Sequence, residues 1–149
     1  MPHHIFVFLH VLAMTLWVGG MFFAYFCLRP AAVKVLEPPQ RLPLWLGTLQ
    51  IFLGYVGVAV IVVLVSGYAM FFAMGAASAP MGVHIMSGTG VVMAVIYAYV
   101  HFMLLSRLRR HCRAEAWAEA ATALGSVRRM VGINLLLGVI TIAAAILGV

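Results

Sequence analysis

The residues best suited to chemistry are histidines and methionines that recur near one end of several apolar segments. His10 lies about two turns inside the first such segment, and Met14 follows it at i+4 on the same helical face. His84 opens the third apolar segment at the corresponding end. An ionisable residue within an apolar segment of membrane-spanning length is a functional-site candidate by default. The candidate metal ligands are His10, His84, Met14, Met70, Met74 and Met86.

The donor atoms of this set favour copper. Imidazole nitrogen suits several transition metals, whereas thioether sulfur selects soft Cu(I). Neutral donors also avoid the free-energy cost of placing a carboxylate in hydrocarbon. The chain has only three acidic residues, and none lies in an apolar segment, which disfavours zinc, calcium and magnesium sites. We therefore predict a copper site with His10 and His84 as principal ligands, while core packing remains the alternative role of each methionine.

A haem is the alternative occupant of the same histidines. His10 and His84 are placed to be axial ligands of a b-type haem held between the first and third apolar segments. Gly88, one turn beyond His84, would admit the porphyrin edge. His101 lies about 25 Å further along the helix, too far away to share this site. On this interpretation the protein exchanges electrons with quinone or oxygen. On a third, it is a structural bundle whose histidines are satisfied by hydrogen bonds.

The charged residues indicate which elements position these side chains. All nine Lys and Arg lie in residues 29–41 and 107–129, and four apolar segments lie between and outside them. The apolar segments fall at about residues 5–28, 49–74, 83–106 and 131–149. Each approaches or exceeds the ~20 residues that a membrane-spanning helix needs, and only helices satisfy their own backbone groups in lipid. The predicted fold is an all-α, integral membrane, antiparallel four-helix bundle that forms a single domain over residues 1–149.

The basic residues also predict an orientation and a set of partners. By the positive-inside rule the two basic connections face the cytoplasm. Both termini and the connection at residues 75–82 then face the periplasm of a bacterial inner membrane. The net charge of +6 anchors these loops rather than binding nucleic acid. The expected partners are the lipid bilayer, a periplasmic metal or electron donor, and a second copy that covers lipid-exposed glycine faces.

Missing residues argue against several function classes. The absence of carboxylates from the apolar segments disfavours a carboxylate-driven proton carrier. The chain has no Walker A sequence, and it has no Asp from which to build a Ser-His-Asp set. We therefore assign no catalytic residue and favour a non-enzymatic protein. If the chain is an enzyme, we expect a haem-dependent membrane oxidoreductase.

Local patterns predict the connections between the helices. Prolines from Pro30 to Pro43 end the first helix and place the start of the second. Either the second helix tilts, or its start lies at the membrane interface with Trp45 as anchor. Residues 114–124 are typical of a helix, and Gly125 offers a break before the fourth span. The short exterior connection predicts a tight hairpin between the second and third helices.

Two polar pairs are expected in the cytoplasmic half of the bundle. Gln50 and Asn134 fall at similar depths on the second and fourth helices, where they would bond each other. His101 would bond Tyr97 or a backbone carbonyl. Both roles are structural.

The first apolar segment carries a sequence signature that points to a family. The run from His10 to Gly20, which reads His-x6-Trp-x-Gly-Gly, resembles the first helix of the CopD-like (copper resistance protein D) membrane proteins. The resemblance extends through Leu28-Arg29-Pro30, residues 36–42 and residues 128–138, and so covers most of the chain. It implies the short, stand-alone four-helix form of that family and a copper-related role in the inner membrane.

The chain is also similar, more distantly, to the HemJ-type protoporphyrinogen oxidases. Their first helix carries a comparable His before Trp, which matches His10 and Trp17. Their third helix begins with a His-x-Lys pattern, where this chain reads His84-Ile85-Met86. The missing lysine argues against the oxidase activity, whereas haem binding through His10 stays compatible with the resemblance.

Overall fold

The computed structural model describes residues 2–147, which form four helical rods. The first rod joins α1 (Pro2–Phe22), the π-helix η1 (Phe23–Leu28) and α2 (Arg29–Val35), and the second is α3 (Pro38–Met74). The third joins α4 (Met81–Tyr99), the π-helix η3 (Val100–Leu104) and α5 (Leu105–Arg113), and the fourth is α6 (Trp117–Leu147). A short 3-10 helix, η2 (Ala76–Ser78), connects α3 to α4. Each rod is long and apolar enough to cross a membrane, which confirms the predicted all-α four-helix membrane bundle.

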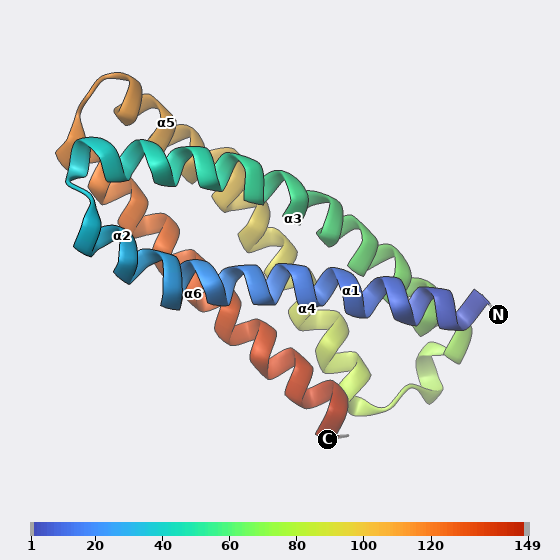
Figure 1. The fold of residues 1–149 in the computed structure, drawn as a ribbon. Coiled ribbons are helices and arrows are strands. Elements are labelled where there is room, and N and C mark those ends of the chain that lie inside the picture. The colour runs from blue at the N-terminus through green and yellow to red at the C-terminus, as the bar shows by residue number, and fades with distance from the viewer. Residues whose placement is uncertain (1, 148–149) are drawn as a thin grey trace.

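The rods run antiparallel, so the molecule has two different ends (Figure 1). The start of α1, the η2 connection and the end of α6 lie at one end, which we call the terminal end. The α2–α3 and α5–α6 connections lie at the other end. We call it the basic end, because all nine Lys and Arg lie on the segments that meet there. The two ends therefore differ in charge before any packing is considered.

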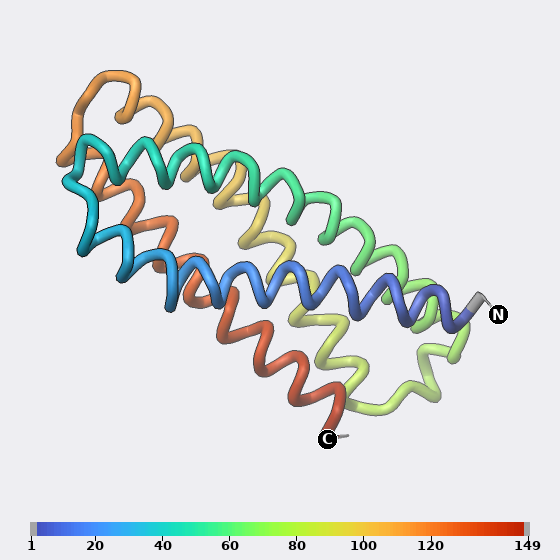
Figure 2. The backbone as a smooth tube through the Cα atoms, in the orientation of Figure 1, coloured from blue at the N-terminus to red at the C-terminus, as the bar shows by residue number. Residues whose placement is uncertain are grey.

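The helices pack mainly in two pairs, α1 with α3 and α4 with α6. The helices α3 and α4 separate toward the η2 connection instead of closing into the tight hairpin that the short connection predicts (Figures 1 and 2). Gly75 ends α3 with a φ of 85°, a left-handed conformation that glycine adopts without a steric penalty. The chain then bridges the separated helix ends through η2.

The helices extend beyond the predicted apolar segments at the basic end. The first rod continues past Pro30 as α2, and α6 passes through Gly125 without a break. Pro30 is tolerated because the preceding π-helix shifts the backbone pairing, so that the N–H of Arg29 bonds the carbonyl of Ala24. Because the pairing is shifted by one residue, one carbonyl has no N–H partner. Pro30, which lacks an N–H, can therefore occupy the next position without loss of a hydrogen bond. The helix breaks predicted at Pro30 and Gly125 are therefore wrong.

The second helix also begins earlier than predicted. Pro38 occupies its first turn, where a missing N–H costs little because no intrahelical partner exists for it. Pro43 then lies inside α3. Trp45 is 7% exposed and packs in the core with Leu42 and Leu49. A membrane-interface anchor must be exposed to lipid headgroups, so that predicted role of Trp45 is wrong.

The buried core is thickest at the basic end. A cluster from α3, η3, α5 and α6 includes Leu42, Leu104 and Leu108, each at most 2% exposed. A second cluster around Trp17 and Met93 occupies the middle of the bundle. At the terminal end the buried cluster contains only Ala13, Ala59 and Val63. The packing density of the bundle therefore decreases from the basic end to the terminal end.

The outer surface of the rods is apolar. Large hydrophobic side chains are exposed on every rod, among them Phe8, Ile61, Val95 and Leu136. Soluble monomers rarely expose contiguous apolar area of this kind, whereas hydrocarbon accepts it directly. The exposed side chains therefore form the lipid-facing surface of the bundle.

The polar pair predicted between Gln50 and Asn134 does not form. The amide of Gln50 lies 3.0 and 3.1 Å from Nε and Nη2 of Arg109, where its oxygen can accept from both. Asn134 is buried, and its Nδ2 donates to the carbonyl oxygen of Met93 at 3.4 Å. The two amides thus point to different helices.

The predicted hydrogen bond between His101 and Tyr97 is also wrong. The two rings stack with centroids 5.5 Å apart and an interplanar angle of 23°. The Tyr97 hydroxyl donates instead to the carbonyl oxygen of Leu53 at 2.9 Å, while His101 Nδ1 is buried without a partner among the described residues. Tyr97 therefore ties α4 to α3, and His101 contributes its ring face.

Candidate functional site

The sparse packing of the terminal end leaves a cavity of about 550 Å³ between α1, α3, α4 and α6. We call it the terminal cavity. Its lining is mostly apolar, and its polar and sulfur-bearing groups come from all four helices. These groups belong to His10, Met14, Thr15, Tyr68, Met86, Ser87, Met93 and Thr141. A cavity of this size lies within the range of about 300–1,000 Å³ typical of small-molecule sites.

His10 is the imidazole of this cavity, and its orientation is fixed by α3. The Nδ1 atom of His10 lies 3.1 Å from the hydroxyl oxygen of Ser66, which is 2% exposed. The same hydroxyl donates its proton to the carbonyl oxygen of Val62, one turn earlier in α3. In the tautomer that carries its proton on Nδ1, the hydroxyl oxygen accepts from that N–H while it donates to Val62. The Nε2 atom then carries the lone pair that a metal would bind.

Gly67 makes room for this imidazole. A Cβ atom at position 67 would lie 2.9 Å from Cε1 and 3.3 Å from Nδ1 of His10. Real Cβ atoms do not approach within 3.0 Å, so any larger residue would push the ring away from Ser66. Gly88, which the haem prediction used as a gap for the porphyrin edge, faces open space and is exposed.

Thioether groups share the cavity with His10. Met14 lies one turn after His10 on α1, and Met86 and Met93 come from α4. Met93 is fully buried, and its sulfur lies 4.0 Å from the hydroxyl oxygen of Thr141. Sequence reasoning missed Met93, although its i+7 spacing from Met86 places both on one helical face.

Three of the six candidate metal ligands lie outside this lining. His84 is exposed and packs edge-on against Phe71, with ring centroids 5.4 Å apart. Since residues two positions apart face opposite sides of a helix, Met86 points inward while His84 points outward. Met70 is half-buried and Met74 is exposed at the end of α3. The structure thus brings together His10, Met14 and Met86, but not His84, Met70 or Met74.

The donor set limits which metals the cavity could hold. Within residues 2–147, no group of three or more His, Cys, Asp and Glu side chains is placed to hold a metal ion. Any ion in the terminal cavity would therefore bind one imidazole together with thioethers and hydroxyls. Zinc sites use three or four imidazole, thiolate or carboxylate ligands, whereas thioethers suit Cu(I). The donors that are present fit Cu(I) better than zinc.

The sequence itself identifies the family. Residues 46–147 match the family model described as copper resistance protein D. The chain belongs to the copper resistance protein D family. This membership confirms the predicted CopD-like resemblance, while the more distant similarity to HemJ-type oxidases stays a prediction. A search of the curated proteins and a search of the solved structures each find no match.

Family membership and the four apolar rods together make this CopD family member a multi-pass membrane protein related to copper resistance. The matched region begins within α3 and includes α4 and α6. It therefore contains Ser66, Gly67, Met86 and Met93, which line or support the terminal cavity. His10 lies before the matched region, so its role depends on the geometry of the cavity.

Proposed function

We propose that this CopD family protein binds Cu(I) in the terminal cavity and holds or moves the ion near the exterior face of the membrane. Nε2 of His10 is the principal ligand, and the thioethers of Met14 and Met86 are its soft partners. Copper is the cargo of the site. The observation that carries this proposal is the contact of His10 Nδ1 with the Ser66 hydroxyl at 3.1 Å, beside a cavity that Met14 and Met86 also line.

The pairing with Ser66 resembles the support that metal-binding histidines usually have. A ligating histidine almost always donates its other ring N–H to an oxygen, which fixes the tautomer and orients the ring. Ser66 provides this oxygen without a negative charge, and no carboxylate is among the described residues that line the terminal cavity. A monovalent, soft ion is the charge that such a neutral apolar site accepts at the lowest free-energy cost.

The exposed histidines and methionines supply an entry route on this proposal. His3 and His4 lie at the start of α1 with ring centroids 5.9 Å apart, and both are exposed. His84 lies against Phe71, which lines the cavity. We propose that these side chains, with Met70 and Met74, receive the ion before it reaches His10.

The orientation follows from charge. If the basic end faces the cytoplasm, as the positive-inside rule requires, the terminal cavity opens toward the periplasm of a bacterial inner membrane. A periplasmic metal donor would then deliver Cu(I) directly to the terminal end. The orientation is measured by cysteine labelling in intact cells, with single cysteines introduced in the η2 connection and in the α5–α6 connection of a variant in which Cys27 and Cys112 are replaced by serine.

The test of copper binding is a competition titration of the purified full chain with a chromogenic Cu(I) chelator. We expect one high-affinity Cu(I) ion per chain. We expect His10→Ala to weaken binding at least a hundredfold and Ser66→Ala to weaken it by roughly tenfold. His101→Ala is the matched control, because His101 is a helical histidine at the other end of the bundle. Wild-type affinity in His10→Ala would overturn the proposal.

Haem binding is the second candidate, and the cavity volume favours it. A volume of about 550 Å³ exceeds what a single ion requires. His10 would be the only histidine ligand offered by the cavity lining, because His84 points outward. The absorption spectrum of the same purified protein separates the candidates. A Soret band that disappears in His10→Ala would establish haem and refute the copper proposal.

A further inference from the structure

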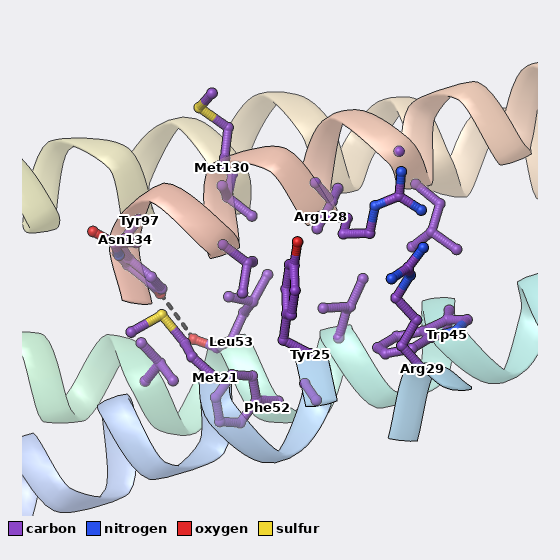
Figure 3. Close-up of a pocket in the computed structure, with 18 of the residues that line it drawn as sticks. Met21, Tyr25, Arg29, Trp45, Phe52, Leu53, Tyr97, Arg128, Met130 and Asn134 are labelled. Atoms are coloured by element: carbon purple, nitrogen blue, oxygen red, sulfur yellow. Dashed lines mark hydrogen bonds between the residues drawn. The ribbon is translucent and has the colours of Figure 1, made fainter. Parts of the chain in front are cut away.

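A second cavity, of about 210 Å³, lies at the basic end and combines an apolar interior with arginines (Figure 3). We call it the basic cavity. Met21, Phe52 and Val56 line its apolar part, which points toward the middle of the bundle. The arginines come from three different helices: Arg29 from α2, Arg41 from α3 and Arg128 from α6.

The three guanidinium groups meet no carboxylate in this cavity. Arg29 lies over the ring of Tyr25, with 5.9 Å from Cζ to the ring centroid. Arg41 donates through Nη1 to the carbonyl oxygen of Leu36 at 3.4 Å. Figure 3 shows Arg29 and Arg128 extending toward the same end of the cavity.

The acidic side chains of the chain lie elsewhere. They are Glu37, Glu115 and Glu119, and none lines the cavity. Like charges brought together next to an apolar wall repel each other more strongly than in water. An anion between the guanidinium groups would convert this repulsion into charge-assisted hydrogen bonds. The cluster therefore favours a bound anion.

We infer that the basic cavity binds one anionic phospholipid of the adjacent leaflet, with its phosphate between the arginines and part of an acyl chain in the apolar interior. Arginine is suited to phosphate because its planar fork donates two parallel hydrogen bonds. Basic pockets between membrane helices on the cytoplasmic side bind anionic headgroups in this way. A cavity of about 150 Å³ accommodates benzene, so 210 Å³ accepts a longer stretch of hydrocarbon.

Two tryptophans make the basic cavity observable. Trp17 and Trp45 line it but are only 2% and 7% exposed. Bulk lipid therefore reaches them poorly, whereas an acyl chain inside the cavity would touch them. Trp17 also lines the terminal cavity, so Trp45 is the reporter specific to the basic cavity. Trp117 is the remaining tryptophan and lies at the start of α6, so Trp117→Phe serves as the background in which to measure the other two.

The experiment reconstitutes the full chain in phosphatidylcholine vesicles that contain a minor fraction of lipid with brominated chains, which quench tryptophan on contact. We expect brominated phosphatidylglycerol to quench much more than the same fraction of brominated phosphatidylcholine. Each arginine near an anionic headgroup contributes roughly a fivefold preference, so Arg29→Gln with Arg128→Gln should reduce the preference roughly thirtyfold. The corresponding Lys double variant should keep most of it, which shows that the folded bundle tolerates change at these positions.

Arg129→Gln is the matched control, because Arg129 is next to Arg128 on α6 and is exposed as Arg128 is, but does not line the cavity. We expect it to keep the wild-type preference. Equal quenching by the two lipids, or an unchanged preference in the double Gln variant, would overturn the inference. So would an equal loss in Arg129→Gln, since surface charge alone would then explain the preference. Displacement of the brominated lipid by soluble glycerol phosphate would assign the site to a free phosphate ester instead.

Discussion

The two ends of this bundle differ in how densely their side chains are packed. At the basic end, Leu42, Leu104 and Leu108 lie in one continuous core, and the remaining cavity measures about 210 Å³. At the terminal end the buried cluster is limited to small residues, and the cavity measures about 550 Å³. Well-packed regions are the most stable parts of a protein, whereas binding sites tend to lie in less stable regions. The dense end therefore contributes most to the stability of the bundle, and the sparse end has the larger space for a ligand.

The ends also differ in the charge of the ligand that each favours. The terminal cavity offers a neutral imidazole and thioethers, which favour a soft cation. The basic cavity offers three guanidinium groups and no carboxylate, which favour an anion. Among the described residues the two cavity linings share only Trp17, so substitutions at other positions of one end should leave the ligand of the other end unaffected. The predictions below test this division.

The largest effect is expected for a core truncation at the basic end. Leu108→Ala removes a side chain that is 0% exposed, and such truncations cost about 3 kcal/mol. Val63→Ala at the terminal end should cost about 1 kcal/mol, because Val63 borders an existing cavity. The free energy of unfolding is measured by denaturing-detergent titration in mixed micelles, followed by circular dichroism. Equal costs at the two positions would contradict the difference in packing between the two ends.

The sequence is sufficient to predict the helices but not their ends. The absence of charges over four long segments, together with the requirement for satisfied backbone groups in lipid, leaves helices as the only solution. At the basic end the helices continue into polar sequence. There the length of an apolar segment no longer indicates where a helix ends. In the sequence, Pro30 indicates a helix end. The structure accommodates Pro30 through a π-helix, and the backbone pairing of that π-helix has no local sequence pattern.

The candidate site can be predicted only in part, for a similar reason. Helical spacing places His10 and Met14 on one face, and both line the terminal cavity. The same spacing places Met86 opposite His84, but it cannot decide which of them faces inward. Ser66 supports His10 from another helix, and such a partner depends on the register of α1 against α3. Contacts between helices therefore lie beyond what periodicity can predict.

An intermediate effect is expected where α3 approaches His10. Gly67→Ala would place a Cβ atom 2.9 Å from Cε1 of His10, which should displace the imidazole and weaken Cu(I) binding about tenfold. Gly54→Ala is the matched control on the same helix, because a Cβ atom at that position would meet no other side chain or helix within 4 Å. The chelator competition titration measures both variants. A Gly67→Ala protein with wild-type affinity would show that the position of His10 against Ser66 does not matter for the metal.

The smallest effect is expected at the boundary between the two ends. Asn134 is 3% exposed. Among the described residues its side chain makes one hydrogen bond, a long one of 3.4 Å to Met93, and its Oδ1 has no partner. A buried unpaired acceptor loses its hydration without compensation, so Asn134→Leu should change the free energy of unfolding by less than about 0.5 kcal/mol or stabilise the bundle slightly. The mixed-micelle titration used for Leu108 measures this change. A loss above about 1 kcal/mol would mean that Oδ1 is paired in the membrane. Asn134 lines the basic cavity, so the hydrogen-bond partner of Oδ1 would then lie in that cavity. The polar part of the basic cavity would in that case extend from the arginines to Asn134.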